Sequence, residues 1–159
     1  MRTLALTGGG SAGHVVPNLA LIPQLKEKFR LVYIGTEGIE RELLKGTGVP
    51  FYTIRAAKFV RGSLYKNALL PLHYLRGLRE ARAALTDAGA DAVFSKGGYV
   101  ALPVVSAAKK LHLPVLSHES DLTAGLANRL IARKCSAVLT SFPETAKELK
   151  NGIFTGSPV

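Results

Sequence analysis

A glycine-rich stretch near the N-terminus ends on a histidine. Gly8-Gly9-Gly10-Ser11-Ala12-Gly13-His14 follows a short apolar run and precedes a segment with helical character. Glycines let backbone N–H groups approach an anion, and a helix N-terminus adds the positive end of its dipole. The stretch therefore predicts a phosphate site with an imidazole at its edge, and imidazole can accept a proton near neutral pH.

Two further polar stretches also follow apolar runs. Residues 96–99, Lys-Gly-Gly-Tyr, form a second glycine turn whose lysine and tyrosine can donate hydrogen bonds. Residues 118–121, His-Glu-Ser-Asp, predict a polar turn in which Glu119 and Asp121 can accept hydrogen bonds from sugar hydroxyls. Each also has a purely structural interpretation, because a Gly-Gly turn can serve only to provide positive φ. Asn128 is equally consistent with a positioning amide and with polar surface.

The elements that must position these stretches alternate regularly along the chain. Apolar runs predict strands at residues 3–7, 31–35, 51–54, 91–95, 114–117 and 136–140. Amphipathic runs predict helices at 15–28, 37–45, 64–88, a segment ending near 111, 123–134 and 144–149. Helices between strands require right-handed crossovers, which predicts a Rossmann-like α/β fold with a doubly wound parallel sheet. Ligands bind at the C-terminal strand ends of such sheets, so the three polar stretches are expected to share one crevice.

Length and composition indicate one globular domain over residues 1–155. The 159 residues are 47% hydrophobic, with a mean hydropathy of +0.18 and a single cysteine, Cys135, which we interpret as a buried, inert thiol. No apolar run approaches the ~18 residues of a spanning helix, and the N-terminus does not resemble a signal peptide. The net charge of +10 favours polyanionic partners. Nucleic acid is disfavoured, because no helix-turn-helix, zinc-finger or RNP-type pattern is present.

Other site chemistries receive little support from the sequence. The histidines and carboxylates lack metal-ligand spacing, so we expect no metal. No nucleophile elbow for covalent catalysis is present, and we expect no cofactor. Gly8, Gly10 and Gly13 satisfy the G-x-G-x-x-G dinucleotide pattern, which keeps an oxidoreductase open as an alternative. The acidic residue this pattern requires is only approximately supplied by Glu37, and His14 does not suit tight helix–strand packing.

A cationic and apolar segment covers residues 61–82. Its apolar side chains occupy more sides than one buried helix stripe requires, and arginines flank them. This combination suits either ordinary core or a contact with an anionic bilayer. The residues predicted to contact a membrane are Leu64, Tyr65, Leu69, Leu72, Tyr74, Leu75, Arg76 and Arg79.

Taken together, these motifs resemble the N-terminal half of the MurG family. The resemblance rests on residues 8–17, 95–100, 118–128 and 156–159, and it covers essentially the whole chain. Members of that family are transferases that add GlcNAc from UDP-GlcNAc to a lipid-linked muramoyl-pentapeptide in peptidoglycan synthesis. The resemblance implies a GT-B architecture, with the acceptor on the N-terminal domain and the nucleotide sugar mostly on a C-terminal domain. Residues 156–159 would then begin the interdomain linker, the donor domain lying outside this chain.

The resemblance also implies roles for individual residues. The acceptor and its diphosphate would contact Gly9, Gly10, Ser11, Gly13, Lys96, Gly97, Gly98, Tyr99, His118 and Asp121. The donor would contact Ser11, Gly13 and Asn128. For inverting transfer to a sugar hydroxyl we assign His14 as the general base, with Glu119 orienting it or binding the sugar; His118 and Glu119 remain alternative bases. The chain would lie peripherally on the cytoplasmic face of the cell membrane.

The sequence departs from the family at several positions and leaves other functions open. Ser11-Ala12 stands where many relatives carry Thr-Gly, Ser120-Asp121 where many carry Gln-Asn, and Ala101-Leu102 replaces a smaller pair. The alternatives are a subunit of another split GT-B transferase acting on a lipid-diphosphate sugar and a non-catalytic, membrane-docking acceptor module. An oxidoreductase domain is the third.

Overall fold

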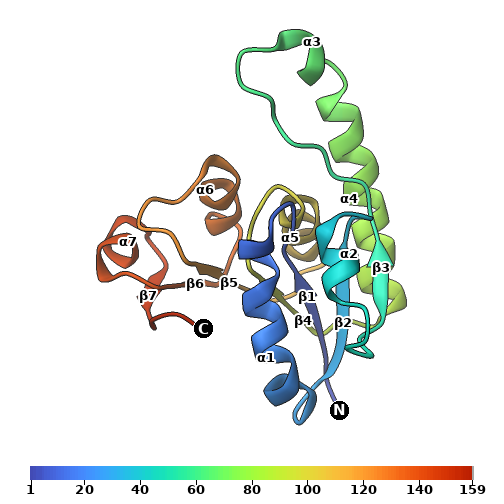
Figure 1. Ribbon diagram of the computed structural model, residues 1–159, viewed down its shortest axis with the longest axis vertical. Coiled ribbons are helices and arrows are strands. Elements are labelled where there is room, and N and C mark those ends of the chain that lie inside the picture. The colour runs from blue at the N-terminus through green and yellow to red at the C-terminus, as the bar shows by residue number, and fades with distance from the viewer. Residues whose placement is uncertain (159) are drawn as a thin grey trace.

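The computed structural model describes residues 1–158 and contains a seven-stranded parallel sheet (Figure 1). The strands are β1 (Thr3–Thr7), β2 (Arg30–Gly35), β3 (Phe51–Thr53), β4 (Ala92–Ser95), β5 (Val115–Glu119), β6 (Ala137–Thr140) and β7 (Gly152–Phe154). Their order is β3-β2-β1-β4-β5-β6-β7, which confirms the predicted Rossmann-like sheet. The direction of winding reverses between β1 and β4, the place where open α/β sheets bind ligands. Val159, the last residue of the expected linker, lies outside the described residues.

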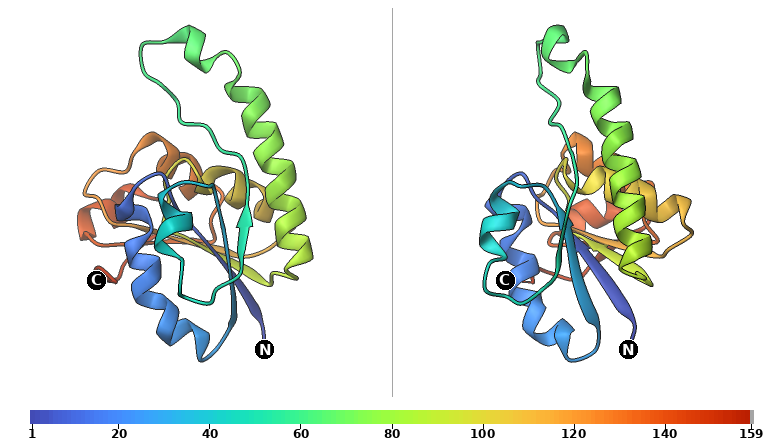
Figure 2. Two further views of the ribbon diagram at one scale, coloured as in Figure 1. Left: turned by 45° about the vertical axis from the view of Figure 1, so that its right-hand side comes forward. Right: turned by 90° about the vertical axis from the view of Figure 1, so that its right-hand side faces the viewer.

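Helices cover both faces of the sheet, as the doubly wound topology requires. They are η1 (Ala12–His14), α1 (Val16–Lys26), α2 (Ile39–Leu43), α3 (Leu64–Asn67), α4 (Leu70–Asp87), α5 (Ala101–Lys110), α6 (Leu126–Ala132) and α7 (Pro143–Glu148). Helices α1 and α2 lie on one face, whereas α4, α5 and α6 lie on the other (Figure 2). No helix in the described part of the chain is both long and apolar enough to cross a membrane.

The alternation of side chains along the strands divides the core into two. Leu6 and Tyr33 point toward α1 and pack with Ile22. On the opposite face, strand residues such as Ala5 and Val93 pack against α4, α5 and α6. Because both faces are covered, the central strands are apolar on both sides, which is why their sequences read as continuous hydrophobic runs.

Several predicted boundaries are wrong, and each error has a physical cause. β5 continues through His118 and Glu119, which the sequence predicts in a turn, because they pair with Leu139 and Thr140 of β6. Backbone pairing extends the strand even though the side chains are polar. α6 begins only after Gly125, whose extended backbone ends the preceding loop, so Asn128 lies in its first turn.

A long arm extends from the same edge of the sheet as the glycine loops (Figure 1). It comprises the loop after β3, the short helix α3 and the upper part of α4. Its base is held by Gly77, because a β-carbon there would lie 2.0 Å from the carbonyl oxygen of Arg55. Glu80 accepts a hydrogen bond from the Arg55 backbone N–H at 2.6 Å. The predicted helical segment over residues 64–88 forms two helices, and Pro71 lies in the first turn of α4, as expected for a proline that marks a helix start or a kink.

The buried side chains of α4 should contribute far more to the free energy of unfolding than the exposed side chains on its outer face. Leu85 is buried in the core, so Leu85→Ala should lower the free energy of unfolding by about 2–5 kcal/mol. The exposed Leu75 on the same helix is the matched control, and Leu75→Ala should change it by no more than about 0.5 kcal/mol. Urea unfolding followed by circular dichroism measures both, and equal effects would contradict this packing.

Candidate functional site

The first glycine loop leaves β1 and turns sharply into η1. Gly8 and Gly10 have φ values of 152° and 81°, in the region that disfavours side chains. The hydroxyl of Tyr33 donates to the Gly8 carbonyl at 2.6 Å. Asn18 on α1 donates to the Thr7 carbonyl at 3.2 Å. Buried polar side chains therefore hold the start of the loop in place.

A buried carboxylate that the sequence analysis did not identify supports the same loop from below. Glu40 on α2 is fully buried and lies against Gly9, where a β-carbon would come within 2.6 Å of its carboxyl carbon. It accepts hydrogen bonds from the Gly10 backbone at 3.3 Å and from the Thr36 backbone at 2.8 Å. Sequence alone does not separate Glu40 from its neighbour Glu42, which pairs with Lys45 at the surface.

The second glycine loop packs directly against the first. Gly98 has a φ of 80°, and a β-carbon there would lie 2.4 Å from the Gly9 carbonyl oxygen and 3.0 Å from Nδ1 of His14. The ring of Tyr99 lies over Gly10, where a β-carbon would be 2.3 Å from its Cε1. The loops after β1 and β4 therefore meet at one edge of the sheet, as predicted.

The third polar stretch joins this edge through Glu119 and Asn128. Glu119 is buried at the end of β5 and accepts a hydrogen bond from Nδ2 of Asn128 at 2.7 Å. The same carboxylate accepts from the backbone N–H of Asp121 at 2.9 Å. Oδ1 of Asn128 in turn accepts from the Gly98 backbone N–H at 3.0 Å. Glu119 thus orients Asn128, and Asn128 holds the second glycine loop.

Lys96 and His118 point into the protein. Nζ of Lys96 lies 2.9 Å from Nδ1 of His118 and 2.5 Å from Oγ of Ser120. Nε2 of His118 lies 2.9 Å from the Gly156 carbonyl oxygen, which can only accept. His118 must therefore carry its proton on Nε2 and accept from Lys96 on Nδ1. Burial lowers the pKa of Lys96 to about 8 and, with Lys96 nearby, also lowers the pKa of His118.

His14 is the titratable side chain at the junction of the two glycine loops. It is half-buried, and its Nδ1 lies 2.9 Å from Oγ of Ser11. Burial lowers the pKa of His14 most strongly and Lys96 lowers it further, while Glu119 and Asp121 raise it. The net direction is downward, so His14 is a neutral imidazole at neutral pH. A neutral imidazole can accept a proton from a substrate hydroxyl.

The dinucleotide alternative does not fit this geometry. In that fold pattern the third glycine allows close packing of helix against strand. A β-carbon at Gly13 would meet only Oγ of Ser11, at 3.9 Å, so no such packing exists here. The backbone N–H of Gly10 is already bonded to Glu40. Glu37, the approximate ribose ligand, instead bonds Thr53 and lies 3.8 Å from Arg41.

The predicted membrane residues do not behave alike. Leu64 and Tyr65, at the tip of the arm, are 93% and 91% exposed. Exposed positions also include Leu69, Leu72, Leu75, Arg76 and Arg79. Tyr74 differs, because it packs against the core and lines a groove beside the arm. Its position on α4 turns Tyr74 toward the groove, away from the outer face on which the exposed leucines lie, and its contact with a membrane stays a prediction.

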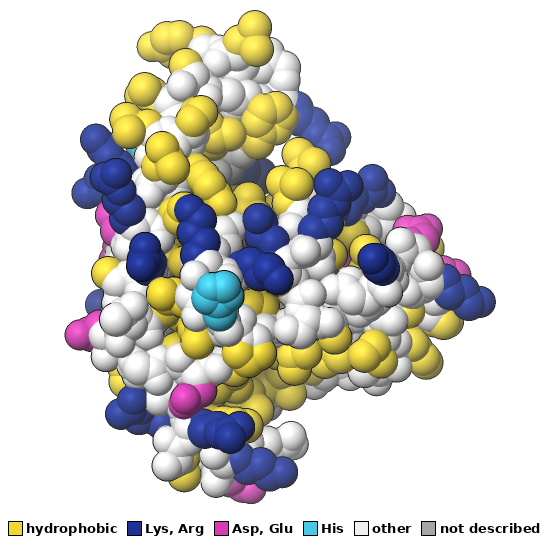
Figure 3. All heavy atoms as spheres, turned by 180° about the vertical axis from the view of Figure 1, so that it is seen from behind, with side chains coloured by type: hydrophobic (Ala, Val, Ile, Leu, Met, Phe, Trp, Pro, Cys, Tyr) yellow, Lys and Arg dark blue, Asp and Glu magenta, His cyan; other side chains and the backbone are white. Residues whose placement is uncertain are grey.

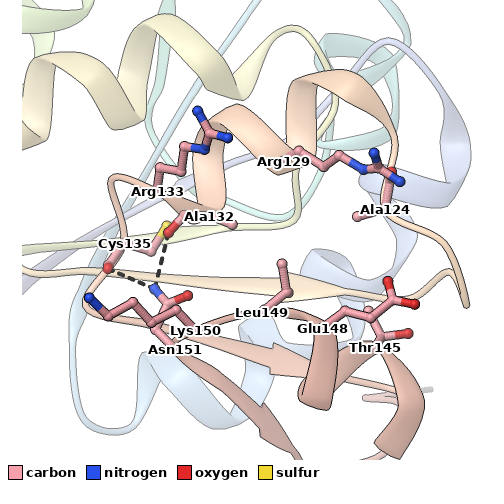
Figure 4. Close-up of a pocket in the computed structure, with 10 residues that line it drawn as sticks. All are labelled: Ala124, Arg129, Ala132, Arg133, Cys135, Thr145, Glu148, Leu149, Lys150 and Asn151. Carbon is pink, nitrogen blue, oxygen red and sulfur yellow. Dashed lines mark hydrogen bonds between the residues drawn. The ribbon is translucent and has the colours of Figure 1, made fainter.

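A second cavity lies away from the glycine loops, between α6 and α7 (Figure 4). Its volume is about 810 Å³, and Asn151 on its wall donates to the carbonyls of Ala132 and Cys135. Cys135 is half-buried and its thiol donates to the Ile131 carbonyl. Burial raises the pKa of Cys135 to about 12, in keeping with an inert thiol. Within residues 1–158, no three His, Cys, Asp or Glu side chains are grouped to hold a metal ion.

Glu40→Gln tests whether the buried carboxylate supports the first loop. The amide keeps the shape but replaces one acceptor oxygen with a donor, so one of the Gly10 and Thr36 bonds is lost. We expect a loss of about 1–3 kcal/mol in stability and faster hydrogen exchange at residues 8–13. The surface variant Glu42→Gln on the same helix should change neither. Unaltered exchange in the Glu40 variant would mean that the loop holds its shape without this carboxylate.

Comparisons with known proteins show which family this chain resembles. The model of the glycosyltransferase family 28 N-terminal domain matches residues 4–140. Proteins named UDP-N-acetylglucosamine–N-acetylmuramyl-(pentapeptide) pyrophosphoryl-undecaprenol N-acetylglucosamine transferase are similar over nearly the whole chain. The protein of Lachnospira eligens is 47% identical, and the match covers 100% of this chain and 46% of that relative. The protein of Clostridium botulinum is 48% identical, and the match covers 97% of this chain and 44% of that relative. This chain thus spans about half the length of the curated relatives it matches.

Solved structures extend the similarity. The crystal structure of MurG from Acinetobacter baumannii superimposes with a TM-score of 0.84 at 30% identity, covering 99% of this chain and 45% of that one. A UDP-GlcNAc 2-epimerase from Methanocaldococcus jannaschii superimposes with a TM-score of 0.72, covering 99% of this chain and 46% of the epimerase chain. Its sequence is only 14% identical, so this similarity shows the fold alone. On the family match and the sequence identity together, this chain belongs to glycosyltransferase family 28, whose N-terminal domain it contains.

Proposed function

We propose that this chain is the acceptor-binding N-terminal half of an inverting GlcNAc transferase of peptidoglycan synthesis. The whole enzyme would move GlcNAc from UDP-GlcNAc to the 4-hydroxyl of a lipid-linked muramoyl-pentapeptide. The observation that carries the proposal is the contact between two glycine loops with the neutral His14 at their junction. The names of the similar proteins, which specify this donor and a pyrophosphoryl-undecaprenol acceptor, support the substrate assignment.

The acceptor diphosphate is proposed to bind beside the junction of the two loops. The backbone N–H groups of Gly10, Gly97 and Gly98 already have partners within the protein. The anion would therefore be bound mainly at the start of η1, by the backbone N–H groups of Ser11 and Gly13, and near the N-terminus of α5. Gly9, Gly97 and Gly98 would contribute by letting the loops pack closely against Glu40, Asn128 and each other. The Tyr99 phenol, whose pKa is raised by burial and by Glu40, stays protonated and can donate.

Other residues predicted to bind the acceptor take indirect roles in this proposal. Lys96 and His118 organise the base of the site, since their polar atoms are bonded inside the protein. Asp121 is exposed at the rim, where it can bind a sugar hydroxyl. Glu119 acts as a positioning residue through Asn128, because both carboxylate oxygens are already occupied.

His14 is proposed as the general base of an inverting displacement. The muramoyl 4-oxygen would form a bond to the anomeric carbon as the bond from that carbon to UDP breaks on the opposite face. The hydroxyl proton would pass to Nε2 of His14, with Nδ1 facing Ser11. UDP would be held by a C-terminal domain, with Ser11, Gly13 and Asn128 at its edge. Residues 156–159 would begin the linker to that domain.

We further propose that the arm attaches the enzyme peripherally to the cytoplasmic face of the membrane. The exposed Leu64 and Tyr65 at its tip can enter the interface. Lys and Arg side chains gather in a band below the arm on the face that α4, α5 and α6 cover (Figure 3). Such a surface is attracted to anionic lipids.

Replacing the proposed base should abolish turnover without unfolding the protein. When the chain is joined to the donor half of a relative and supplied with UDP-GlcNAc and the lipid-linked acceptor, His14→Gln should lower kcat by about 10²–10⁴-fold. The His73→Gln variant, on α4 and away from the loops, should retain activity. Full activity of the His14 variant would contradict the assignment. Transfer only to a different lipid-diphosphate sugar would favour another transferase of the same architecture.

The pH profile should report the lowered pKa of His14. A base must be unprotonated, so kcat/KM should fall as the pH drops through the pKa of His14 in the free enzyme. Because burial lowers that pKa from 6.5, the acid limb should lie below pH 6.5. The residual activity of His14→Gln should lack this limb. An acid limb at or above 6.5 in the unsubstituted enzyme would contradict the proposed environment.

A further inference from the structure

A groove of about 660 Å³ runs beside the arm, between α4 on one side and α5 and α6 on the other. Its walls are built mainly from large apolar side chains, namely Phe59, Leu70, Tyr74, Leu102, Leu126 and Leu130. Lys58, Arg61 and Lys134 are the charged residues among the described residues of its lining, and none of those described residues is acidic. Hydrophobic side chains bordered by Lys and Arg are visible under the arm in Figure 3.

The groove is continuous with the two glycine loops through Tyr99. Tyr99 is one of the residues that line the groove, and its ring lies over Gly10. A ligand that places an anion at the loops would therefore direct whatever is attached to that anion along the groove. The groove is large enough for a small-molecule ligand, since such sites range over roughly 300–1,000 Å³.

The lining favours a hydrocarbon over a peptide. A peptide buried there would need partners for its backbone N–H and C=O groups, and an unpaired buried polar group is costly. A hydrocarbon needs no such partners, and the three cations of the lining suit an anionic ligand. We propose that this groove binds the first isoprenoid units of the acceptor's polyprenyl chain, next to the diphosphate. The inference rests on the proposed function for the identity of the acceptor.

This subsite differs from the membrane contact at the tip of the arm. Leu64 and Tyr65 do not line the groove, and they project from the end of the arm. In the proposed arrangement the tip meets the bilayer, while the groove takes hydrocarbon that has left it. The chain segment nearest the diphosphate would thus be recognised by the protein, and acceptors with the same headgroup would be distinguished by their lipid.

Binding of prenyl diphosphates tests the subsite directly, without vesicles, detergent or a donor domain. Farnesyl diphosphate, below its micelle concentration, should bind this chain at least about tenfold more tightly than inorganic diphosphate, because each buried methylene contributes about fourfold in affinity. Isothermal titration measures both. Equal affinities would overturn the proposal.

Two matched double variants locate the hydrocarbon. Leu126→Ser with Leu130→Ser alters the groove, whereas Leu72→Ser with Leu75→Ser alters the outer face of α4; these four leucines are 39–59% exposed. The groove variant should lose the preference for farnesyl diphosphate while its affinity for inorganic diphosphate stays unchanged, and the outer-face variant should keep the preference. Equal losses in both would show that the hydrocarbon adheres to a general bilayer-docking surface, which overturns the proposal.

Additional variants and competition measurements keep the test decisive. Should the serine variant unfold by circular dichroism, Ala127→Phe fills the groove instead and must remove the preference. Competition between a lipid-free muramoyl-pentapeptide and farnesyl diphosphate would assign the groove to the peptide and overturn the proposal. If the prenyl preference is found but no GlcNAc transfer occurs with a donor half, the groove stands and the transferase assignment fails. GlcNAc transfer without a prenyl preference would overturn the groove proposal and support the transferase assignment.

Discussion

The site depends on two loops that meet backbone to backbone. Gly98 lies so close to the Gly9 carbonyl and the His14 ring that a β-carbon there would overlap the carbonyl oxygen. This contact is possible because β1 and β4 are neighbours at the point where the sheet changes its direction of winding. The two loops are therefore one unit, and a side chain added at Gly98 would separate them. The positions of His14 and Tyr99 follow from this contact.

Buried charges organise the unit from behind. Glu40 bonds the first loop, Glu119 reaches the second through Asn128, and Lys96 connects the base of the second loop to His118. Burying such groups is costly unless hydrogen bonds replace the lost water, and here each has partners. Their function is to hold backbone in place. The groups left to meet a ligand include His14, Tyr99, Asp121 and backbone N–H groups, a set that suits an anion beside a proton acceptor.

The arm gives the domain a second kind of surface. It leaves the sheet at the edge where the loops lie, so an amphiphile can have its anion at the loops and its hydrocarbon beside the arm (Figure 1). Gly77 and Glu80 fix the base of the arm against Arg55. The spacing between loops and arm is thus set by packing within the domain, and a ligand need not order it.

The sequence alone predicted a parallel α/β sheet and the placement of three polar stretches at one edge, and it made His14 the candidate base. Those conclusions depend on hydrophobic periodicity and on the handedness of crossovers, which are local or topological properties. Only the tertiary structure decided which polar side chains have their partners within the protein. Glu40 could not be told from Glu42, and Lys96, which the sequence predicts at the phosphate, points at His118. Partners far apart in sequence decide these orientations, because a buried charge turns toward the groups that satisfy it.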